Sequence, residues 1–372
     1  MESIKDMINR LCPNGVKRIK LADCLEYEQP TKYQVSSKDY LDNGTPVLTA
    51  GQTFILGYTD ETNGVYHASK EQPVIIFDDF TTSFHWVDFD FKVKSSAMKM
   101  LTPCNKEANF RFIYYAMKCI KYETLEHSRQ WISTYSQFEI PLPPLEIQSR
   151  IVEVLDKMTT LTAELEAELE ARKQQYEYYR NKLLSFSEIG GGIRFVKLGD
   201  VCELERGKVF SKKYIEEHPG QYPVFSSQTA NNGELGKIDT FNYNGEFLTW
   251  TTDGAYAGTI FYREGKFSIT NVCGLIKNND TMFNIKFLFH WLRLVAKNYV
   301  YSGMGNPKLM SNQTAEILIP VLTMQEQQRI VSILDRFEAL TTDLQSGLPA
   351  EIEARRQQYE YYRNKLLTFE AV

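Results

Sequence analysis

Apolar positions recur at alternating spacings of four and three residues along a long segment in the middle of the chain. The positions on this seam are Ile151, Leu155, Met158, Thr162, Leu165, Leu169, Arg172, Tyr176, Tyr179, Leu183 and Phe186. Heptad spacing is typical of a coiled coil, whereas a helix that lies on a sheet has a wider apolar face. About forty residues in this conformation extend about 60 Å. The pattern therefore predicts a long spacer helix over residues 146–188.

The same spacing returns near the end of the chain, but with an interruption. The seam positions there are Ile330, Leu334, Phe337, Thr341 and Leu344, followed by Arg355, Tyr359, Tyr362 and Leu366. Between the two groups lies an insertion of four residues, which is a stutter. Gly347 and Pro349 fall in it and predict a break or kink. We predict a second spacer helix over 322–372, kinked near Gly347–Pro349, with a capping box at Thr323 and Glu326.

These two helical segments are copies of one sequence. Residues 171–186 read ARKQQYEYYRNKLLSF and residues 354–369 read ARRQQYEYYRNKLLTF, and residues 140–158 match residues 319–337 in the same register. A period near 180 residues is too long for a solenoid, so a domain-plus-helix unit has been duplicated. Each helix follows a globular half, which predicts antiparallel pairing of the two helices. The alternative is that each helix packs on its own domain as a surface helix.

The globular halves, residues 1–145 and 189–321, have a different pattern. Short runs of β-branched and aromatic residues at 74–80, 86–94, 246–252 and 258–270 are separated by polar loops that contain glycine and asparagine. Each half also carries a helical stretch, at 109–120 and 284–296. The prediction is an α+β fold: two mixed, strand-rich domains of similar fold, separated by two long antiparallel helices and related by internal pseudo-twofold duplication. A short helix is expected at the N-terminus.

Composition excludes several classes of protein. No apolar run is long enough to span a membrane, and residues 1–11 are too charged for a signal peptide, which predicts a cytoplasmic protein. Six scattered cysteines without a C-x-x-C pair are expected to be reduced thiols. The net charge of −5 comes from the helices, since residues 146–188 hold nine acidic and six basic groups and residues 322–370 hold eight and six. The globular halves are therefore neutral, which is compatible with a local basic groove.

Motifs for catalysis are missing from the sequence. It contains no G-x-x-x-x-G-K-[ST], G-x-G-x-x-G or G-x-S-x-G pattern, and its five histidines have no metal-binding spacing. Pro143-Pro144 lacks the polar lead-in and the aromatic residue of an adenine methyltransferase motif. Glu203, Glu205 and Lys208 resemble a nuclease carboxylate–lysine set, but the matching segment around residues 26–28 has no lysine. We predict no catalytic residue and no metal ligand.

Polar loops at matched places in the two halves are the candidate binding residues. In the first half these are Lys32, Tyr33, Gln52, Thr81, Thr82, Ser83, His85, Arg129 and Gln130. In the second half they are Arg206, Lys208, Ser227, Gln228, Thr229, Asn231, Thr252, Asp253, Tyr256, Asn306 and Lys308. Side chains of these types reach base edges and phosphates, although any one of them is more often a turn former or a solvated loop residue. Loops at matched positions with different side chains favour two domains that recognise two different short base sequences.

The Q-Y-E-Y-Y-R-N-K-L-L helix ends, the I-P entries to the helices and the divergent halves resemble the specificity subunit of type I restriction–modification systems. The resemblance covers essentially the whole chain. It implies that each half is a target recognition domain for one half of a bipartite, asymmetric site in double-stranded DNA. It also implies that the helices set the spacer and dock two adenine-methyltransferase subunits, to which restriction subunits are added. S-adenosylmethionine, ATP and Mg²⁺ would belong to those partners, so this chain is expected to bind no cofactor.

Near-identical helix ends are expected where two copies of one partner dock by pseudo-twofold symmetry. Tyr178 and Tyr361 lie off the seam, and with Arg180 and Arg363 they are the candidate partner-binding residues. The other tyrosines of the repeat fall on the seam and are equally well explained by helix packing. Two alternative functions remain open from the residues alone: a stand-alone DNA-binding regulator, and a coiled-coil scaffold that binds only protein.

Overall fold

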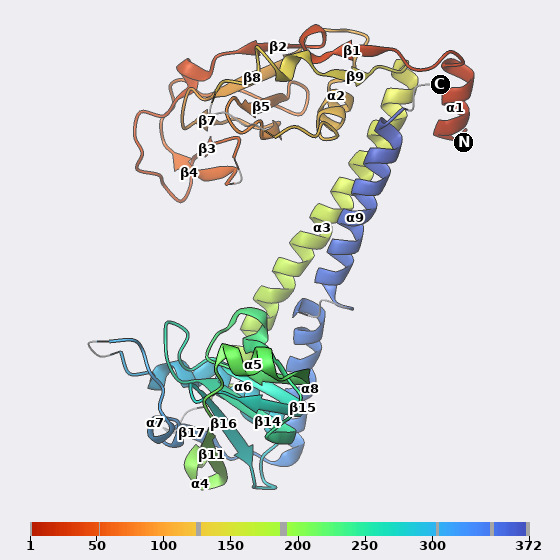
Figure 1. Ribbon diagram of the computed structural model, residues 1–372. Coiled ribbons are helices and arrows are strands. Elements are labelled where there is room, and N and C mark those ends of the chain that lie inside the picture. Colours follow the sequence, from red (N-terminus) through yellow and green to blue (C-terminus); the bar gives the residue numbers. More distant parts are fainter. Residues whose placement is uncertain are drawn as a thin grey trace. The chain divides into compact units, whose positions relative to one another are not determined.

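The computed structural model describes residues 2–51, 53–123, 128–186, 192–302, 305–342 and 346–369 (Figure 1). The chain packs as two compact units. Unit 1 consists of residues 1–166 and 351–372, and unit 2 consists of residues 167–350. Each unit contains one strand-rich domain and parts of the long helices, as the α+β prediction requires.

Unit 1 contains two larger sheets and one two-stranded ladder. The four-stranded sheet is antiparallel and has the order β2 (Leu25–Glu28), β8 (Met98–Pro103), β5 (Val74–Asp78) and β6 (Phe84–Val87). The three-stranded sheet has the order β4 (Ile55–Thr59), β3 (Thr45–Leu48) and β7 (Lys92–Val93), with β3 and β7 parallel. Helix α2 (Phe110–Met117) packs in the core, and a short ladder of β1 (Arg18–Lys20) and β9 (Glu139–Pro141) leads into the first long helix. The short 3-10 helices are η1 (Leu21–Asp23), η2 (Pro30–Tyr33) and η3 (Tyr135–Gln137).

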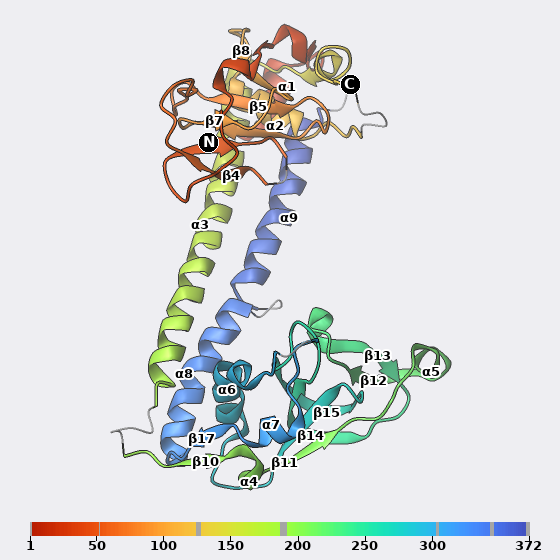
Figure 2. The same cartoon turned by 90° about the vertical axis from the view of Figure 1, so that its left-hand side faces the viewer.

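Unit 2 is built on one six-stranded sheet (Figure 2). Its order is β11 (Cys202–Arg206), β16 (Cys273–Asn278), β14 (Tyr243–Thr251), β15 (Ile260–Ile269), β12 (Pro219–Phe225) and β13 (Glu234–Ile238). Its helices are α4 (Leu198–Val201), α5 (Lys212–Glu217), η4 (Ala230–Gly233), α6 (Ile285–Val295), η5 (Ala296–Tyr299) and α7 (Ser311–Ala315). The ladder of β10 (Phe195–Lys197) and β17 (Leu318–Pro320) corresponds to β1 and β9 of unit 1. The predicted similarity of the two domains is confirmed in this shared order of elements.

The long helices are α3 (Leu145–Leu183), α8 (Met324–Thr342) and α9 (Leu348–Leu367). The predicted interruption is present, because α8 ends at Thr342 and α9 begins at Leu348 with Pro349 in its first turn. The proline needs no N–H partner there, so it starts the new helix without loss of a hydrogen bond.

Antiparallel pairing is confirmed within each unit. In unit 1, Glu166 of α3 forms an ion pair with Arg356 of α9 at 2.5 Å. Leu155, nearer the start of α3, shares a core with Leu367 at the end of α9. In unit 2, the Tyr179 ring of α3 stacks on Phe337 of α8 with centroids 5.6 Å apart. Each long helix segment therefore packs on a helix from the other copy of the repeat.

Two local sequence patterns have a structure that differs from a single strand or a complete capping box. The run 86–94 is not one strand, because β6 ends at Val87 and the chain crosses to the other sheet before β7. Phe91 and Val93 are buried in a separate core beneath that sheet, which explains their apolar character. The capping box is only half formed: Thr323 accepts from the Glu326 N–H at 3.3 Å, but the Glu326 carboxylate is taken by Arg329 at 2.6 Å. A cation is a stronger partner for a carboxylate than a neutral amide.

The expected N-terminal helix is α1 (Ile4–Leu11), capped by the Ser3 side chain. Its Met7 is buried, and Ile4 and Ile8 pack with Leu366 and Phe369 around the same core. Within the described ranges, no helix combines the length and apolar character that crossing a membrane requires.

Candidate nucleic-acid interface

A buried aspartate joins two of the predicted loops in unit 1. The Asp79 carbonyl accepts from the Gln130 N–H at 2.7 Å, and its carboxylate accepts from the Trp131 N–H at 2.8 Å. The same carboxylate lies 3.3 Å from the ammonium of Lys99, which β8 carries into the core. The loop after β5 and the loop before η3 therefore share one anchor, and neither can shift without disturbing a buried charge pair.

Unit 2 repeats this link in its main chain but not in its side chains. Strand pairing sets Phe77 opposite Lys99 in unit 1 and Trp250 opposite Gly274 in unit 2, so Thr252 corresponds to Asp79. The Thr252 carbonyl accepts from the Leu309 N–H at 3.0 Å, as Asp79 does from Gln130. In place of the ion pair, the indole of Trp250 covers Gly274 and donates to the Leu309 carbonyl at 2.9 Å.

In unit 1, the hairpin between β5 and β6 contains three of the predicted residues, of which Thr81 and Ser83 reach the surface. The Asp78 carboxylate accepts from the Phe80 and Thr81 N–H groups, which fixes the turn. Thr82 has φ of 58°, a strained conformation for a β-branched residue, and its side chain is buried. Thr81 is exposed and Ser83 is partly exposed, and their hydroxyls are 3.0 Å apart. Arg129 is exposed on the adjoining loop.

Other predicted residues of unit 1 have structural partners. Gln130 is buried, and its amide bonds the Tyr122 hydroxyl at 2.8 Å and the Ser128 carbonyl at 2.9 Å, so it is not available to a ligand. His85 faces the Gly51 carbonyl at 3.0 Å, and burial lowers its pKa. Lys32 and Tyr33 on η2 both contact the Glu28 carboxylate instead of the loops around Asp79. Gln52 lies outside the described residues.

In unit 2, the loop after β14 and the loop before α7 come together. Asp253 and Lys308 face each other at 3.7 Å, and Tyr256 is 62% exposed beside them in sequence. Asn306 is also exposed, whereas Thr252 is buried as the anchor. Of the residues predicted after β11, Arg206 donates to the Asn271 carbonyl and Lys208 is exposed.

The remaining predicted residues of unit 2 lie before β13. Ser227 and Thr229 are partly exposed, Asn231 is exposed with φ of 49°, and the Gln228 amide donates to the Glu234 carbonyl. This loop is held by Arg263, which sequence reasoning missed. Its guanidinium donates to the Asn232 carbonyl at 2.8 Å and lies 3.6 Å from the Phe225 ring centroid, and burial lowers its pKa to about 10.

A buried glutamine joins each domain to its long helix in the same way. Gln148 accepts from the Asn109 N–H at 2.7 Å and donates to the Glu107 carbonyl at 2.8 Å. Gln327 accepts from the Asn284 N–H at 2.8 Å and donates to the Met282 carbonyl at 2.7 Å. Both asparagines cap the helix that follows them, α2 or α6. The domain helix and the long helix thus share one polar joint, which the identity of the glutamines in the two copies could have signalled.

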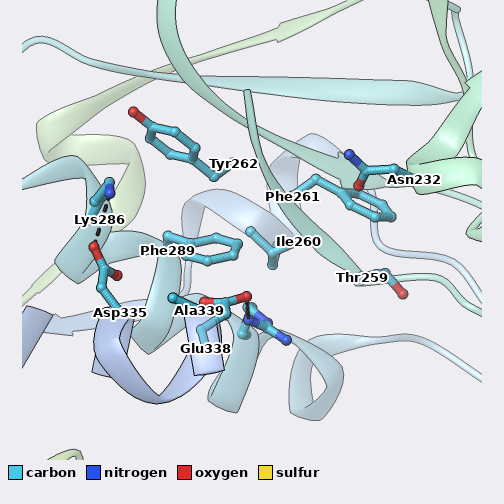
Figure 3. A pocket seen from close by; sticks show the side chains of 11 residues that line it. Asn232, Thr259, Ile260, Phe261, Tyr262, Lys286, Phe289, Asp335, Glu338 and Ala339 are labelled. Carbon is cyan, nitrogen blue, oxygen red and sulfur yellow. Dashed lines mark hydrogen bonds and ion pairs between the residues drawn. The ribbon is translucent and has the colours of Figure 1, made fainter. Parts of the chain in front are cut away.

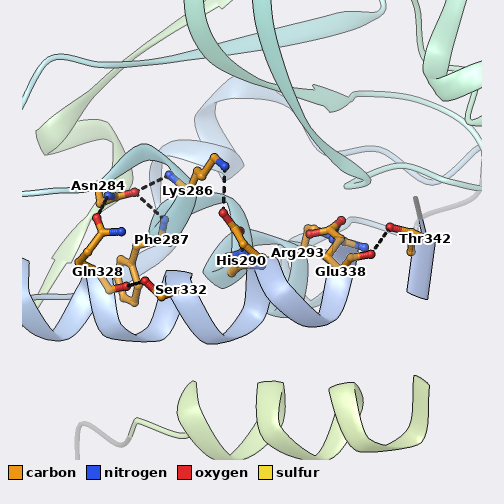
Figure 4. Close-up of polar contacts among 10 residues, drawn as sticks. Asn284, Lys286, Phe287, His290, Arg293, Gln328, Ser332, Glu338 and Thr342 are labelled. Carbon is orange, nitrogen blue, oxygen red and sulfur yellow. Dashed lines mark hydrogen bonds and ion pairs between the residues drawn. The ribbon is translucent and has the colours of Figure 1, made fainter. Parts of the chain in front are cut away.

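About two turns further along each long helix, an aspartate forms a second link. Asp156 pairs with Arg111 at 2.8 Å in unit 1, and Asp335 pairs with Lys286 at 2.9 Å in unit 2. Figure 4 shows the side chains of α6, including His290, facing α8. Burial raises the pKa of Asp335, but hydrogen bonds from His290 and Lys286 outweigh that effect and hold it below its usual value.

His290, Asp335 and Glu338 bring one ligand atom each within 4.8 Å of one another, a spacing that suits a metal ion. Both carboxylates are already paired with cations, since Lys286 holds Asp335 and Arg293 holds Glu338 at 2.8 Å. The arrangement is that of an ion-pair network. It borders a cavity of about 620 Å³ that is lined by the partly buried rings of Phe261, Tyr262 and Phe289 (Figure 3).

The predicted partner-binding residues form the same surface twice. Tyr178 is 60% exposed and Tyr361 is 58% exposed, with Lys182 and Lys365 lying 5.7 and 5.5 Å from their ring centroids. Beside them, the guanidiniums of Arg180 and Arg363 donate to the next residue, Asn181 and Asn364, in both cases at 3.2 Å from Nε. We call these two groups of residues, 178–182 and 361–365, the tyrosine patches.

Known proteins share both the sequence and the fold. The profile of the "Type I restriction modification DNA specificity domain" matches residues 13–172 and 191–354. The specificity subunit of the type I restriction enzyme EcoR124I/EcoR124II of Escherichia coli is 42% identical over 384 residues, which cover 95% of this chain and 94% of that one. A putative type I specificity subunit of Mycoplasma pneumoniae is 42% identical over 233 residues, or 61% of this chain and 92% of the relative.

A solved type I restriction–modification S subunit from M. genitalium has the same fold, with a TM-score of 0.65 at 17% identity over 95% of this chain and 96% of that one. A chain solved in a study of assembly of the type I R-M system gives a TM-score of 0.55 at 16% identity, over 95% and 98% of the two chains. The twofold profile match and the full-length relative lead to one assignment: the chain belongs to the type I restriction modification DNA specificity family.

Proposed function

We propose that each strand-rich domain reads one half of a bipartite, asymmetric site in double-stranded DNA, and that the long helices set the number of unspecified base pairs between the halves. The observation that carries this proposal is the repeated loop anchor. The carbonyls of Asp79 and Thr252 accept the same main-chain hydrogen bond, from the loop before η3 in unit 1 and from the loop before α7 in unit 2. The side chains around the two carbonyls nevertheless differ. A common scaffold with unlike contact residues suits two different half-sites.

Single-molecule methylome sequencing tests the proposal in a host that carries this gene together with the gene of its methyltransferase partner. The expected result is modified adenine within a split sequence, with a gap of constant length between two unlike words. A modified sequence without a gap, or two identical words, contradicts the proposal. A host with the partner gene alone serves as the control, and it should show no such sequence.

For the partners, we propose two methyltransferase subunits per chain, with restriction subunits added to that core. The support is the pair of tyrosine patches, in which Tyr178 and Tyr361 have corresponding neighbours at similar distances. Two equal surfaces on one chain suit two copies of one protein. The mass of the purified complex gives the number of copies directly, and a single copy that saturates the chain contradicts the proposal.

Chemistry is assigned to the partners in this proposal, and the chain itself is non-catalytic. S-adenosylmethionine, ATP and Mg²⁺ are then bound by the methyltransferase and restriction subunits, and the complex acts on genomic DNA in the cytoplasm. The ion pairs of the His290 network support this division, because its carboxylates already have cationic partners. Calorimetric titration of the isolated chain with S-adenosylmethionine is expected to show no binding, and a stoichiometric signal would overturn the assignment.

A further inference from the structure

Gln130 and Leu309 occupy equivalent positions in the two units, although their loops differ in sequence. Each donates its N–H to the residue that follows the β5 or β14 strand end, Asp79 or Thr252. Eight residues later along each chain segment, the carbonyls of Phe138 and Ile317 accept from Leu21 and Leu198, at 3.0 and 2.8 Å. Because each segment is held by the same two hydrogen bonds, eight residues apart, the residues that precede Gln130 and Leu309 are equivalent as well. Those residues are Arg129 and Lys308.

The main chain at both residues is held, while the side chains are not. Lys308 exchanges both main-chain hydrogen bonds with Tyr301, at 2.8 and 3.0 Å, and the residue after Arg129 is buried on Asp79. Arg129 is exposed, and across the described ranges no hydrogen bond or ion pair is found for its guanidinium. Lys308 has 53% of its side chain exposed and only a 3.7 Å contact with Asp253.

Other arginines of the strand-rich domains contrast with Arg129. Arg18 pairs with Glu139, Arg206 donates to the Asn271 carbonyl, and Arg263 is buried on its loop. A guanidinium with five free donors, presented on a fixed backbone, can bind a guanine edge in a bidentate manner or a phosphate. A lysine at the same point supplies a charge and rotatable donors.

Exposed side chains around both positions suit a nucleic acid. In unit 2, Tyr256 and Tyr301 are 62% and 64% exposed on the loops that flank Lys308, and aromatic rings at such places stack on bases or sugars. In unit 1, Thr81 is exposed in the loop that Asp79 anchors, next to Thr82, whose strained conformation is of a kind retained where a defined conformation matters.

We infer that Arg129 and Lys308 are equivalent DNA-contacting residues, each serving one half of the recognition site. The inference rests on the proposed function, since it assumes that each domain reads its own half. It assigns the two domains one shared mode of contact, in which a basic side chain projects from a loop fixed by the Asp79 or Thr252 carbonyl.

The test uses the complete complex with Arg129→Ala or Lys308→Ala in the chain. Two control variants each remove a lysine from another part of the same domain. These are Lys106→Ala, at an exposed position after β8, and Lys277→Ala, near the end of β16. The probe is a DNA duplex with the split sequence recovered from the wild-type methylome. Each test variant is expected to weaken binding about tenfold, the effect of one lost base or phosphate contact, while the controls stay within about twofold.

Methylome sequencing then identifies the half that each residue serves. Arg129→Ala is expected to broaden the bases accepted in one half only, and Lys308→Ala those in the other half only. If a variant binds all sequences more weakly, and the slope of log affinity against log salt concentration falls by about one, the result also supports contact, in that case with a phosphate. Arg129→Lys separates the two, because it keeps the charge and loses the bidentate geometry.

The inference is overturned if both alanine variants bind and methylate like the two control variants. It is also overturned if one substitution broadens both halves equally. A wild-type complex that modifies no split sequence would instead refute the proposed function itself, so the two failures are distinguishable.

Discussion

Lys99 and Asp79 form a charge pair inside unit 1, with Nζ and Oδ2 3.3 Å apart and side-chain exposures of 0% and 2%. Desolvation of both ions costs free energy that the attraction between them roughly offsets, so the pair contributes little net stability. Its effect is on position. Asp79 also accepts from Trp131 and Gln130, and the charge of Lys99 therefore fixes where both loops meet.

Replacement of Lys99 by methionine is expected to lower the free energy of unfolding of unit 1 by about 3–5 kcal/mol, because the Asp79 carboxylate stays buried without its cation. Adding Asp79→Asn should recover most of this loss, since the amide oxygen still accepts from Trp131. Urea denaturation of the three proteins measures the effect, and Lys94→Met, at an exposed lysine nearby in sequence, is the control. A single substitution no more destabilising than Lys94→Met would contradict the positioning role.

Gly274 takes the place of Lys99 in unit 2 and makes room for the indole of Trp250. A Cβ at this glycine would lie 2.3 Å from the ring, closer than side-chain atoms approach. Gly274→Ala is expected to displace the indole, to break its hydrogen bond to Leu309 and to destabilise unit 2 by about 1–3 kcal/mol. Gly305→Ala is the matched control, because nothing lies within 4 Å of that position. Equal unfolding curves for the two variants would show that Trp250 is not confined there.

The buried glutamine Gln327 should be as important to unit 2 as an apolar core residue. Gln327→Leu removes the partner of the Asn284 N–H and of the Met282 carbonyl, both only partly shielded from water, at a total cost of about 1–3 kcal/mol. Exposed Gln325 on the same helix is the control, and Gln325→Leu is expected to have no measurable effect. Thermal unfolding compares the two variants. A similar melting temperature for both would mean that the joint does not hold α6 to α8.

Repetition in the sequence explains why the helices could be predicted. Heptad spacing, the break before Pro349 and antiparallel pairing all follow from local patterns that appear twice, and the structure has each of them. The loop anchors could not be predicted in this way. Asp79 and Trp131 are 52 residues apart, and their meeting depends on how the sheet and the following loop fold back.

Burial was the other property that local sequence did not reveal. Gln130 lies in a polar loop and was predicted to contact DNA, but its amide is enclosed by Tyr122 and Ser128. Arg263 lies in a strand rich in charge, where an exposed side chain is the ordinary expectation, yet it is buried over Phe225. The residue type of a polar side chain does not by itself determine whether the side chain faces the solvent or the core. The structural roles of the pairs Gln148/Gln327 and Asp156/Asp335 are easier to predict from the sequence, because the same residue occurs at matched positions of both copies.

Removal of one tyrosine patch should remove one methyltransferase subunit. Truncation of an exposed interface tyrosine costs about 2 kcal/mol or more where it is an anchor, or about 30-fold in affinity. Tyr178→Ala and Tyr361→Ala are each expected to yield a complex with one methyltransferase copy, and the double variant a chain with none. Native mass spectrometry counts the copies. Glu177→Ala and Glu360→Ala change the neighbouring exposed residues and should keep both copies bound. If the double variant still binds two methyltransferase copies, the docking surface lies outside the tyrosine patches.

Deletion of Glu166–Leu169 from α3 tests the relation between helix length and spacer. Four helical residues span about 6 Å, against about 3.4 Å for one base-pair step, so the unspecified gap is expected to shorten by at most about two base pairs. Both half-sites should keep their sequences, because the deleted residues belong to neither domain. Glu166→Ala removes the ion pair with Arg356 at full helix length and should leave the gap unchanged. Methylome sequencing of the three strains decides the matter: an altered half-site with an unaltered gap would assign the quad to recognition and not to spacing.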